Sequence, residues 1–272
     1  MEIKGKVAVV TGAGSGIGQA TALELARLEV RGLALVDRSD AVRELAERIN
    51  HDAAGAVARP YIGDTCEIAF RRSVYDDVQA TFGLAAICIP AAGITRDGLA
   101  VKIDKTSGRA QLYPEETFHL VTEVNYVAPV YWVLEMIARI AEARHRRGAG
   151  RWDPRTEKLQ GTAVFIGSVS SQGNKGQLAY AAAKRGLEGA ASTLMKEGMY
   201  YGVKCAVIHP GFTDTPMVRA LGEEYIEKNI LPYTQLRRLI RPEEIASAIC
   251  FLVRNSAVSG ELWADAGWHP SA

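Results

Sequence analysis

Cysteine is scarce in this sequence, and its placement argues against a disulfide scaffold. The four cysteines, Cys66, Cys88, Cys205 and Cys250, are scattered, with no CxxC pair and no histidine at ligand spacing. We therefore expect buried free thiols in a reducing compartment, and no metal site. The stretch before Val7 leaves no room for a signal peptide ahead of the first predicted strand, so the expected location is the cytoplasm.

Charge of one sign and long apolar runs are also missing. The 32 basic and 31 acidic residues give a formal net charge of +1, so nothing global favours nucleic acid or an acidic membrane as a partner. No apolar run reaches the length that spans a bilayer. The composition, 48% hydrophobic and 23% charged, is ordinary for a soluble protein, and no low-complexity linker divides the 272 residues. We expect a single domain.

The N-terminal region combines an apolar strand with a glycine-rich turn. Residues 7–10 are apolar throughout, as in a parallel strand covered on both faces, and TGAGSGIG follows at 11–18 before a helical stretch at 19–28. Glycines allow a tight turn and a close approach of the backbone to a pyrophosphate, while the helix N-terminus supplies N–H donors. This strand–turn–helix context predicts a dinucleotide-binding site.

Acidic residues follow the next two predicted strands. Asp37 ends the strand at 32–36, about 20 residues past the glycines, where an acid accepts the hydroxyls of an adenosine ribose and repels a 2′-phosphate. It therefore favours NAD over NADP, although Arg38 can accommodate a 2′-phosphate, and Asp37 as a plain strand-end residue is the alternative. Asp64 can accept from an adenine amino group, cap the helix starting near Cys66, or do both.

Strand and helix patterns alternate along the chain. A third strand is predicted to start at Ala56 and a fourth to run from Ala85 to Ala91. Strands at 204–208 and 261–264 close the series. This alternation predicts right-handed βαβ units. The expected fold is α/β: a Rossmann-like, doubly wound, mainly parallel seven-stranded sheet with helices on both faces.

The stretch 168–184, SVSSQGNKGQLAYAAAK, brings together hydroxyl, phenol and ammonium groups. Tyr180 and Lys184 are four residues apart with helix-forming alanines between them, so they share one helix face. A neighbouring cation lowers a tyrosine pKa from about 10 toward neutrality, and the phenol can then exchange a proton with an alcohol or carbonyl oxygen. Ser168, just past a predicted strand, can donate to the same oxygen. The alternative is a surface Tyr–Lys pair on an ordinary helix.

Motifs along essentially the whole chain occur in an order that resembles the short-chain dehydrogenases/reductases. They are Thr11-Gly12-x3-Gly16-x-Gly18, Asp37, Asp64, Gly93, Asn125, Ser168, Tyr180, Lys184 and the segment from His209 to Thr215. Each motif is weak alone, whereas their shared order is specific. Within that family, residues 93–97 (GITRD) and 167–169 (GSV) are most similar to 3-oxoacyl-carrier-protein reductases.

The resemblance implies a role for each matching residue. Tyr180 is implied to be the general acid/base, Lys184 to lower its pKa and bind the nicotinamide ribose, and Ser168 to orient the reacting oxygen. Asn125 is implied to hold a water linking Lys184 to solvent, with a helix-interior amide as the alternative. The expected cofactor contacts are Gly12, Ser15, Gly16, Ile17, Gly18, Asp37, Arg38, Asp64, Thr65, Ala92, Gly93, Tyr180, Lys184, Pro210, Gly211, Thr213 and Thr215.

Two prolines depart from the family pattern. Pro90 stands in the fourth predicted strand, where it removes a backbone donor from a central ladder. Pro129 follows Asn125 closely and predicts a kink in that helix. Neither change removes a group that performs the chemistry.

Two segments are predicted insertions, near 102–113 and 144–160. The first is expected to lengthen a loop before a helix that opens at Pro114. The second carries glycines, a proline and several arginines, which indicates a solvent-exposed loop. A solvated face is one interpretation of these arginines, and a docking patch for an acidic or phosphopantetheine-bearing partner is the other.

The C-terminal third is expected to shape a substrate pocket. Residues 212–238 lack one clean periodicity, and their apolar side chains indicate either a mobile helical lid or packed core. A final helix begins at Pro242, with an apolar face. His209 and His269 have no acid partner that the sequence identifies, so we expect structural roles for both.

The favoured hypothesis is an NAD-dependent oxidoreductase that interconverts a small-molecule secondary alcohol and a ketone. A 3-oxoacyl thioester reductase, acting on acyl carrier protein or CoA, is the alternative. A catalytically silent dinucleotide-binding regulator is the alternative from another class, and the presence of Ser168, Tyr180, Lys184 and Asn125 argues against it. The resemblance implies a homotetramer or homodimer packed through the Asn125 and Tyr180 helices, and the small face of Ala183, Ala190 and Ala191 is compatible with this.

Overall fold

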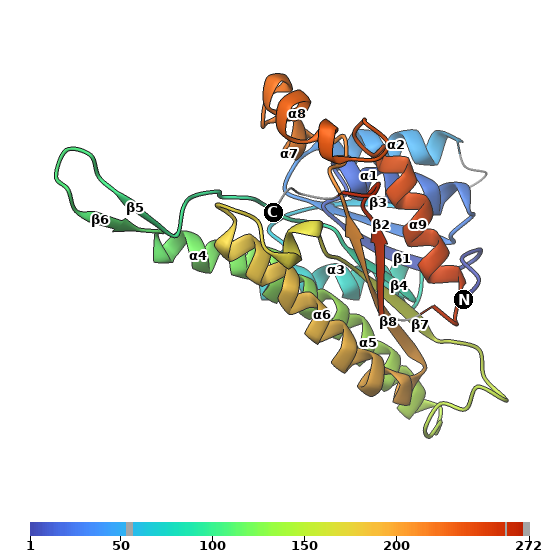
Figure 1. Ribbon diagram of the computed structural model, residues 1–272. Coiled ribbons are helices and arrows are strands. Elements are labelled where there is room, and N and C mark those ends of the chain that lie inside the picture. Colours follow the sequence, from blue (N-terminus) through green and yellow to red (C-terminus); the bar gives the residue numbers. More distant parts are fainter. Residues whose placement is uncertain (53–56, 259, 269–272) are drawn as a thin grey trace.

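Seven parallel strands form one sheet in the order β3-β2-β1-β4-β7-β8-β9 (Figure 1). The computed structural model describes residues 1–52, 57–258 and 260–268 of the chain. The strands are β1 (Val7–Thr11), β2 (Gly32–Asp37), β3 (Ala58–Ile62), β4 (Ile87–Pro90), β7 (Gly161–Ile166), β8 (Val203–Pro210) and β9 (Gly260–Ala264). The predicted doubly wound α/β fold is confirmed, and the sheet is entirely parallel. The predicted start of the third strand, Ala56, lies outside the described residues.

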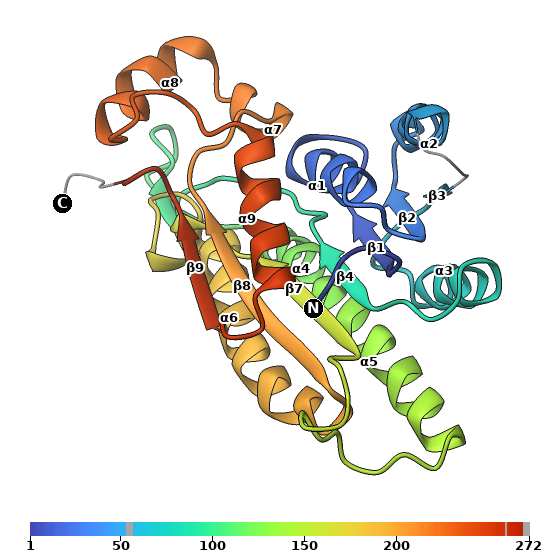
Figure 2. The same ribbon diagram turned by 90° about the vertical axis from the view of Figure 1, so that its right-hand side faces the viewer.

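Helices cover both faces of the sheet, as Figure 2 shows. One layer contains α1 (Gly16–Arg27), α2 (Ala41–Asp52) and α9 (Pro242–Arg254), and the other contains α3 (Ile68–Thr81), α5 (Ala128–Arg146) and α6 (Leu178–Gly198). The central strands are apolar on both faces because each side chain meets one of these layers; every residue of β1, β7 and β8 is buried. Strand order reverses between β1 and β4, and the crevice at such a switch point is where doubly wound sheets bind ligands.

Both prolines flagged in the sequence fit without breaking their elements. Pro90 is the last residue of β4, and the register of β4 with β7 covers only Ile87 and Cys88, so the missing N–H costs no ladder bond there. Pro129 is the second residue of α5, directly after a π-helical turn at Glu123–Val127. The wider turn joins α4 (Glu115–Thr122) to α5 and changes the backbone hydrogen-bonding pattern there, so the N–H that Pro129 lacks is not needed.

The predicted loop at 102–109 is instead the tip of a β-hairpin. Strands β5 (Val101–Ile103) and β6 (Ala110–Leu112) pair antiparallel and project well away from the body of the molecule (Figure 1). The Asp104 carboxylate accepts from the backbone N–H groups of Thr106 and Ser107, which closes the turn. All six strand residues are exposed, so no buried face marks these strands in the sequence.

The segment 144–160 is only partly the solvated loop that was predicted. Helix α5 continues to Arg146, and Arg144 is buried rather than exposed, at 1% of its free surface. Its guanidinium pairs with the Glu157 carboxylate and donates to the Gly150 carbonyl at 2.9 Å. The rest of the segment is irregular. The arginines at 146, 147, 151 and 155 are exposed as predicted, whereas Arg144, at the start of the segment, belongs to neither a solvated face nor a docking patch.

Residues 212–238 form both a pocket wall and a small core of their own. They contain α7 (Pro216–Arg219), α8 (Glu223–Asn229) and a 3₁₀ turn at Leu231–Tyr233. Ile226, Ile230 and Leu239 are buried together, with Trp268 packed against them. The packed-core interpretation therefore holds for Ile226 and Ile230, while other residues of the segment line a pocket and the mobile lid stays a prediction.

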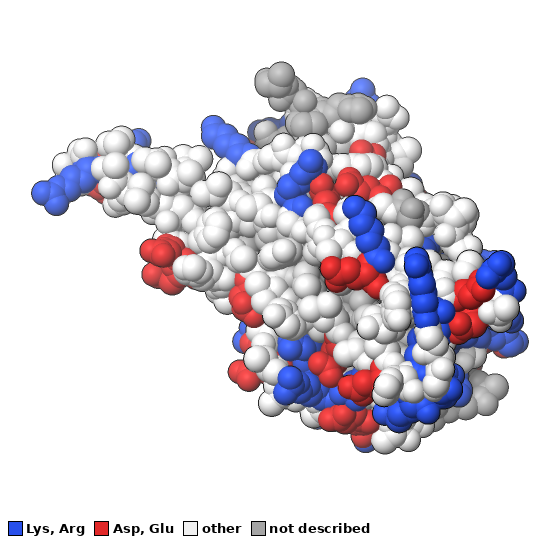
Figure 3. Space-filling view, turned by 90° about the horizontal axis from the view of Figure 1, so that it is seen from below, with Lys and Arg blue, Asp and Glu red and all other residues white. Residues whose placement is uncertain are grey.

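The small face predicted for subunit packing is mostly used inside the monomer. Ala183 and Ala191 are each 3% exposed, Ala191 belongs to the core under α6, and Ala190 is half-buried. Seen from below, the middle of this side of the molecule carries few charged side chains (Figure 3).

Within the described residues, no helix combines the length and apolar character needed to cross a membrane.

Candidate active site

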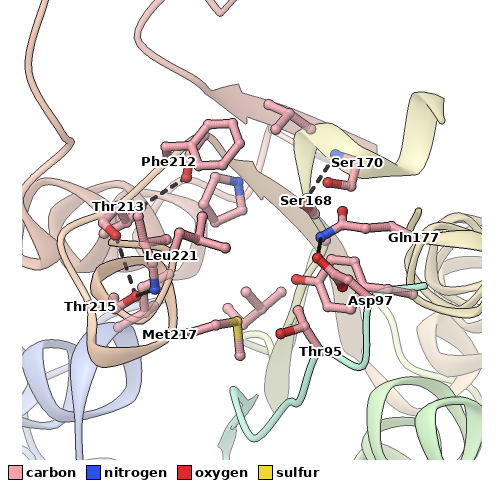
Figure 4. A pocket seen from close by; sticks show the side chains of 18 residues that line it. Thr95, Asp97, Ser168, Ser170, Gln177, Phe212, Thr213, Thr215, Met217 and Leu221 are labelled. Carbon is pink, nitrogen blue, oxygen red and sulfur yellow. Dashed lines mark hydrogen bonds between the residues drawn. The ribbon is translucent and has the colours of Figure 1, made fainter. Parts of the chain in front are cut away.

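Two adjoining hollows lie where the carboxyl ends of the strands meet the loops. The first is a cleft along the glycine turn, and the second is a pocket between Ser168 and the segment that carries α7 (Figure 4). Their linings share Ile17, Ile166, Tyr180, Thr215 and Met217. A long ligand in the cleft and a small one in the pocket would therefore meet beside Tyr180.

The glycine turn is built for close backbone approach. Gly12 has a φ of +66°, and a Cβ there would lie 2.6 Å from the backbone nitrogen of Ala92. A Cβ on Gly18 would lie 2.1 Å from the carbonyl oxygen of Gly12, so helix α1 packs directly on the turn. Ser15 precedes α1 and makes no capping hydrogen bond with its side chain, which leaves the first N–H groups of the helix facing the cleft. The turn fits a dinucleotide pyrophosphate.

Asp37 and Arg38 line the same cleft at the end of β2. The Asp37 carboxylate accepts from the backbone N–H of Gly14 at 2.9 Å and from that of Ser39 at 3.0 Å. These bonds hold the carboxylate against the glycine turn, at the position where the sequence places a ribose acceptor. Asp37 is therefore more than a plain strand-end residue.

Asp64 and Thr65 also line the cleft, after β3. Asp64 does not cap α3, since the N-cap is Glu67; its Oδ1 accepts from the backbone N–H of Cys66 at 2.9 Å in a local turn. The Thr65 carbonyl accepts from the indole N–H of Trp132 at 2.9 Å. Helix α5 thus fixes the floor of the cleft through a fully buried tryptophan.

Tyr180 and Lys184 lie side by side on α6, and both line the cleft. The Lys184 Nζ is 5.5 Å from the centre of the Tyr180 ring and donates to the Ile166 carbonyl at 2.8 Å. Burial raises the pKa of Tyr180 to about 12, with a bond to Ser168 acting in the opposite direction. Burial lowers the pKa of Lys184 to about 8. The spacing is as predicted, but the expected lowering of the Tyr180 pKa is wrong for the protein alone, because loss of solvent outweighs the bond to Ser168 and the Asp97 charge also raises the pKa.

Ser168 follows β7 and faces the pocket from the same side as Tyr180 (Figure 4). Its Oγ accepts from the backbone N–H of Ser170 at 3.1 Å, which fixes the start of a 3₁₀ turn at Val169–Gln172. Asp97 and Gln177, which the sequence analysis did not single out, line this wall and bond to each other at 3.0 Å. The only signal for Asp97 was its place in the GITRD stretch.

Apolar side chains form the opposite wall. Phe212, Met217, Val218 and Leu221 line it, all from the segment expected to be a lid or core. Pro210, Gly211, Thr213 and Thr215, predicted cofactor contacts, also line the pocket. The pocket therefore offers one polar and one apolar side to a ligand.

Asn125 does not line either hollow, since it is fully buried on the π-helical turn. Its amide nitrogen donates to the carbonyls of Ile94 and Val121, and its amide oxygen accepts from the N–H of Ile94. Asn125 thus holds the loop that carries Ala92 and Gly93, both of which line the cleft. Helical bulges of this kind are frequent at functional sites.

His209 has two acid partners that the sequence did not reveal. Its Nε2 lies 3.3 Å from a Glu261 oxygen and 3.8 Å from a Glu188 oxygen, and its ring stacks on Trp263. Burial lowers the pKa of His209 against the opposing effect of both carboxylates. The structure thus supplies acid partners that the sequence could not identify, and the structural role expected for His209 stays a prediction. His269, for which a structural role was also expected, lies outside the described residues.

The fold and the two hollows define a class of protein: an α/β oxidoreductase with a dinucleotide cleft beside a serine, a tyrosine and a lysine. Residues 6–226 match the family model described as short chain dehydrogenase, and the chain belongs to that family. Members bind a nicotinamide dinucleotide, and the glycine turn fits that group. The predicted resemblance is confirmed.

Similar proteins agree with this assignment over nearly the whole length. The chain is 33% identical over 264 residues to the 3-oxoacyl-[acyl-carrier-protein] reductase of Escherichia coli, covering 96% of each. It is 31% identical over 271 residues to the acetoacetyl-CoA reductase of a Synechocystis species, covering 98% of this chain and 97% of the relative. A solved structure of a putative NAD(P)-dependent gluconate 5-dehydrogenase from Beutenbergia cavernae, with bound NADP at low occupancy, aligns with a TM-score of 0.78 at 27% identity. That alignment covers 98% of this chain and 99% of the other.

Proposed function

We propose that this protein reduces a 3-oxoacyl thioester to the 3-hydroxyacyl product, with Tyr180 as the general acid. The observation that carries the proposal is the shared wall at Tyr180, where the cofactor cleft opens into the pocket. The nicotinamide supplies the hydride when it is bound. Ser168 orients the ketone oxygen from the polar side, and Tyr180 donates its phenol proton to the developing alkoxide. Lys184 and Asn125 hold this arrangement.

The shape of the pocket favours this substrate over a generic secondary alcohol, because the apolar wall of Phe212, Met217, Val218 and Leu221 suits an acyl chain. The raised pKa of Tyr180, about 12, keeps the phenol protonated, which favours the reductive direction for any ketone. The names of the two relatives, a 3-oxoacyl-carrier-protein reductase and an acetoacetyl-CoA reductase, support the same substrate class. A small hydrophobic or cyclic alcohol is the second candidate.

Purified protein assayed with acetoacetyl-CoA and a reduced nicotinamide tests the proposal directly. We expect loss of nicotinamide absorbance in step with formation of the 3-hydroxyacyl thioester. Turnover of small cyclic ketones or alcohols but not of thioesters would support the second candidate, a small hydrophobic or cyclic alcohol as the substrate. A panel of thioesters, ketones and alcohols with no turnover would favour the catalytically silent dinucleotide-binding regulator.

For the cofactor we propose NAD(H), on the strength of Asp37. Its carboxylate is fixed against Gly14, and a fixed negative charge at this site repels a 2′-phosphate. Asp37→Ala should lower kcat/KM with NADH by about tenfold or more, the worth of a hydrogen bond to a charged group, and narrow the preference over NADPH. Asp40→Ala, an exposed acid on the same surface, should leave both values unchanged.

NADP is the competing cofactor, because Arg38 lines the same cleft and the Beutenbergia structure has NADP bound. A wild-type preference for NADPH that falls in Arg38→Ala would replace the NAD proposal. It would leave the proposed reaction in place.

We propose that the protein is a homotetramer or homodimer, packed through the side formed by α4, α5 and α6. Apolar residues are exposed on that side, including Leu120 at 47% and Tyr131 at 49%, although the predicted alanine face is mostly used inside the monomer. A monomer in sedimentation equilibrium at micromolar concentration would exclude it.

A further inference from the structure

Three side chains with ligating atoms converge next to Ser168, at the open edge of the sheet. His209 on β8, Glu188 on α6 and Glu261 on β9 place one ligand atom each within 4.8 Å of one another. Figure 2 shows β9 as the edge strand beside β8, with α6 behind them. Three different elements thus contribute, so the cluster is not a run of acids on one surface.

Two atoms of this cluster are buried and lack hydrogen-bond partners among the described residues. They are Nε2 of His209 and Oε1 of Glu188. His209 is fully buried and Glu188 is 7% exposed, so water does not freely reach either atom. Buried polar atoms are nearly always hydrogen-bonded, so a ring nitrogen and a carboxylate oxygen that lie unpaired near each other leave a place for a cation between them.

The other side of the imidazole contacts the backbone of Ser168. Its Nδ1 lies 3.2 Å from the carbonyl oxygen of Ser168, and the backbone N–H of Ser168 points at the same nitrogen from 3.3 Å. Histidine ligands commonly donate their second ring N–H to a backbone carbonyl, which fixes the tautomer and leaves the other nitrogen free to coordinate. In the tautomer whose Nδ1–H donates to the Ser168 carbonyl, the lone pair on Nε2 faces both carboxylates.

We propose that Glu188, His209 and Glu261 bind one divalent transition-metal cation of the zinc class. An imidazole nitrogen with two carboxylate oxygens is a ligand set that Zn²⁺ accepts, and water can complete the coordination. Glu261 is 40% exposed at its side chain and gives the cation access from solvent. This site was not expected from the sequence, because its three ligands are 21 or more residues apart.

The charges around the cluster are compatible with a dication. Arg185 pairs with Glu188 at 2.7 Å through Oε2, the oxygen that is not aimed at His209. The Glu188 carboxylate is therefore partly neutralised and the Glu261 carboxylate is not, so the cluster by itself carries excess negative charge. A bound dication removes that excess and satisfies both unpaired atoms at once.

Zinc binding to the untagged, metal-stripped protein tests this site without any need for enzymatic activity. Zn²⁺ is titrated in competition with a chromophoric chelator, and its effect on the melting temperature is followed in parallel. We expect one tight site per chain and a melting temperature that rises with Zn²⁺ concentration, since the ligand binds only the folded state. Glu188→Gln and His209→Gln should each weaken that site by at least about 100-fold, beyond the loss typical of outer-shell changes.

A matched control comes from a surface pair with the same chemistry. His119 and Glu115 lie 3.5 Å apart on α4 with both side chains exposed, so His119→Gln should leave the tight site unchanged. Glu261→Gln, at a partly exposed position, decides the outcome if a buried variant fails to fold. The site does not exist if the wild type binds no Zn²⁺ tightly, if tight binding survives in Glu261→Gln, or if it is lost in His119→Gln. The proposal is independent of the reductase assignment.

Discussion

Tyr180→Phe is expected to lower kcat by roughly 10²–10⁴-fold, the range typical for loss of a positioned general acid. The phenol is the titratable group at the junction of the cofactor cleft and the adjoining pocket, and its half-buried ring lies beside Lys184. Removing one oxygen leaves that packing intact. Dinucleotide affinity, measured by fluorescence titration, should therefore change little while turnover is nearly lost.

Tyr225→Phe provides the matched control, because Tyr225 is 52% exposed on α8 and lies away from both hollows. It should retain full turnover. If Tyr180→Phe keeps wild-type kcat with an unchanged pH profile, the proton comes from another donor and the proposed mechanism is wrong.

The pH dependence of reduction gives a second readout of the same pair. Burial lowers the pKa of Lys184 to about 8, so its ammonium loses its proton as the pH rises through that value. The cation supports the phenolate that forms when Tyr180 gives up its proton. We therefore expect kcat/KM, which reports the free enzyme, to fall above about pH 8. A profile that stays flat to pH 10 would show that this ammonium does not assist the step.

The parts of the fold that local pattern encodes could be predicted from the sequence. Continuous apolar runs marked the buried strands, and the glycine turn between β1 and α1 marked the cleft. The spacing of Tyr180 and Lys184 on α6 placed them correctly, because helical geometry is local. Family resemblance added Asn125 and, after β8, Gly211, Thr213 and Thr215; the last three line a hollow and Asn125 does not.

What the sequence did not reveal depends on contacts between distant residues and on burial. Arg144 reads as a surface arginine until Glu157 and Gly150 are placed beside it. His209 meets Glu188 and Glu261 only because β8, α6 and β9 are neighbours in space. The Tyr180 pKa moved opposite to expectation because pairing was visible in the sequence and loss of solvent was not. The β5–β6 hairpin was missed because its strands are short and have no buried face.

Lys204 is the strongest case of a charge whose role only the fold reveals. It lies in β8, where every residue is buried, and is itself 1% exposed. Its ammonium donates to the carbonyls of Leu252, Asn255 and Val258, at 2.7 Å and 3.0 Å for the latter two. These carbonyls lie at and after the C-terminal end of α9, where the last turn of a helix lacks intrahelical partners.

Lys204→Met should therefore destabilise the protein by about 3 kcal/mol, because several buried carbonyls lose a charged donor while the side-chain volume is nearly kept. Urea unfolding followed by circular dichroism measures this as a lower midpoint. Lys196→Met, at an exposed position on α6, should change stability by no more than about 0.5 kcal/mol. The substitution leaves the apolar contacts of β8 in place. A large loss of stability in Lys204→Met but not in Lys196→Met would therefore show that Lys204 stabilises the protein by capping α9. Equal midpoints for the two variants would instead mean that water satisfies those carbonyls.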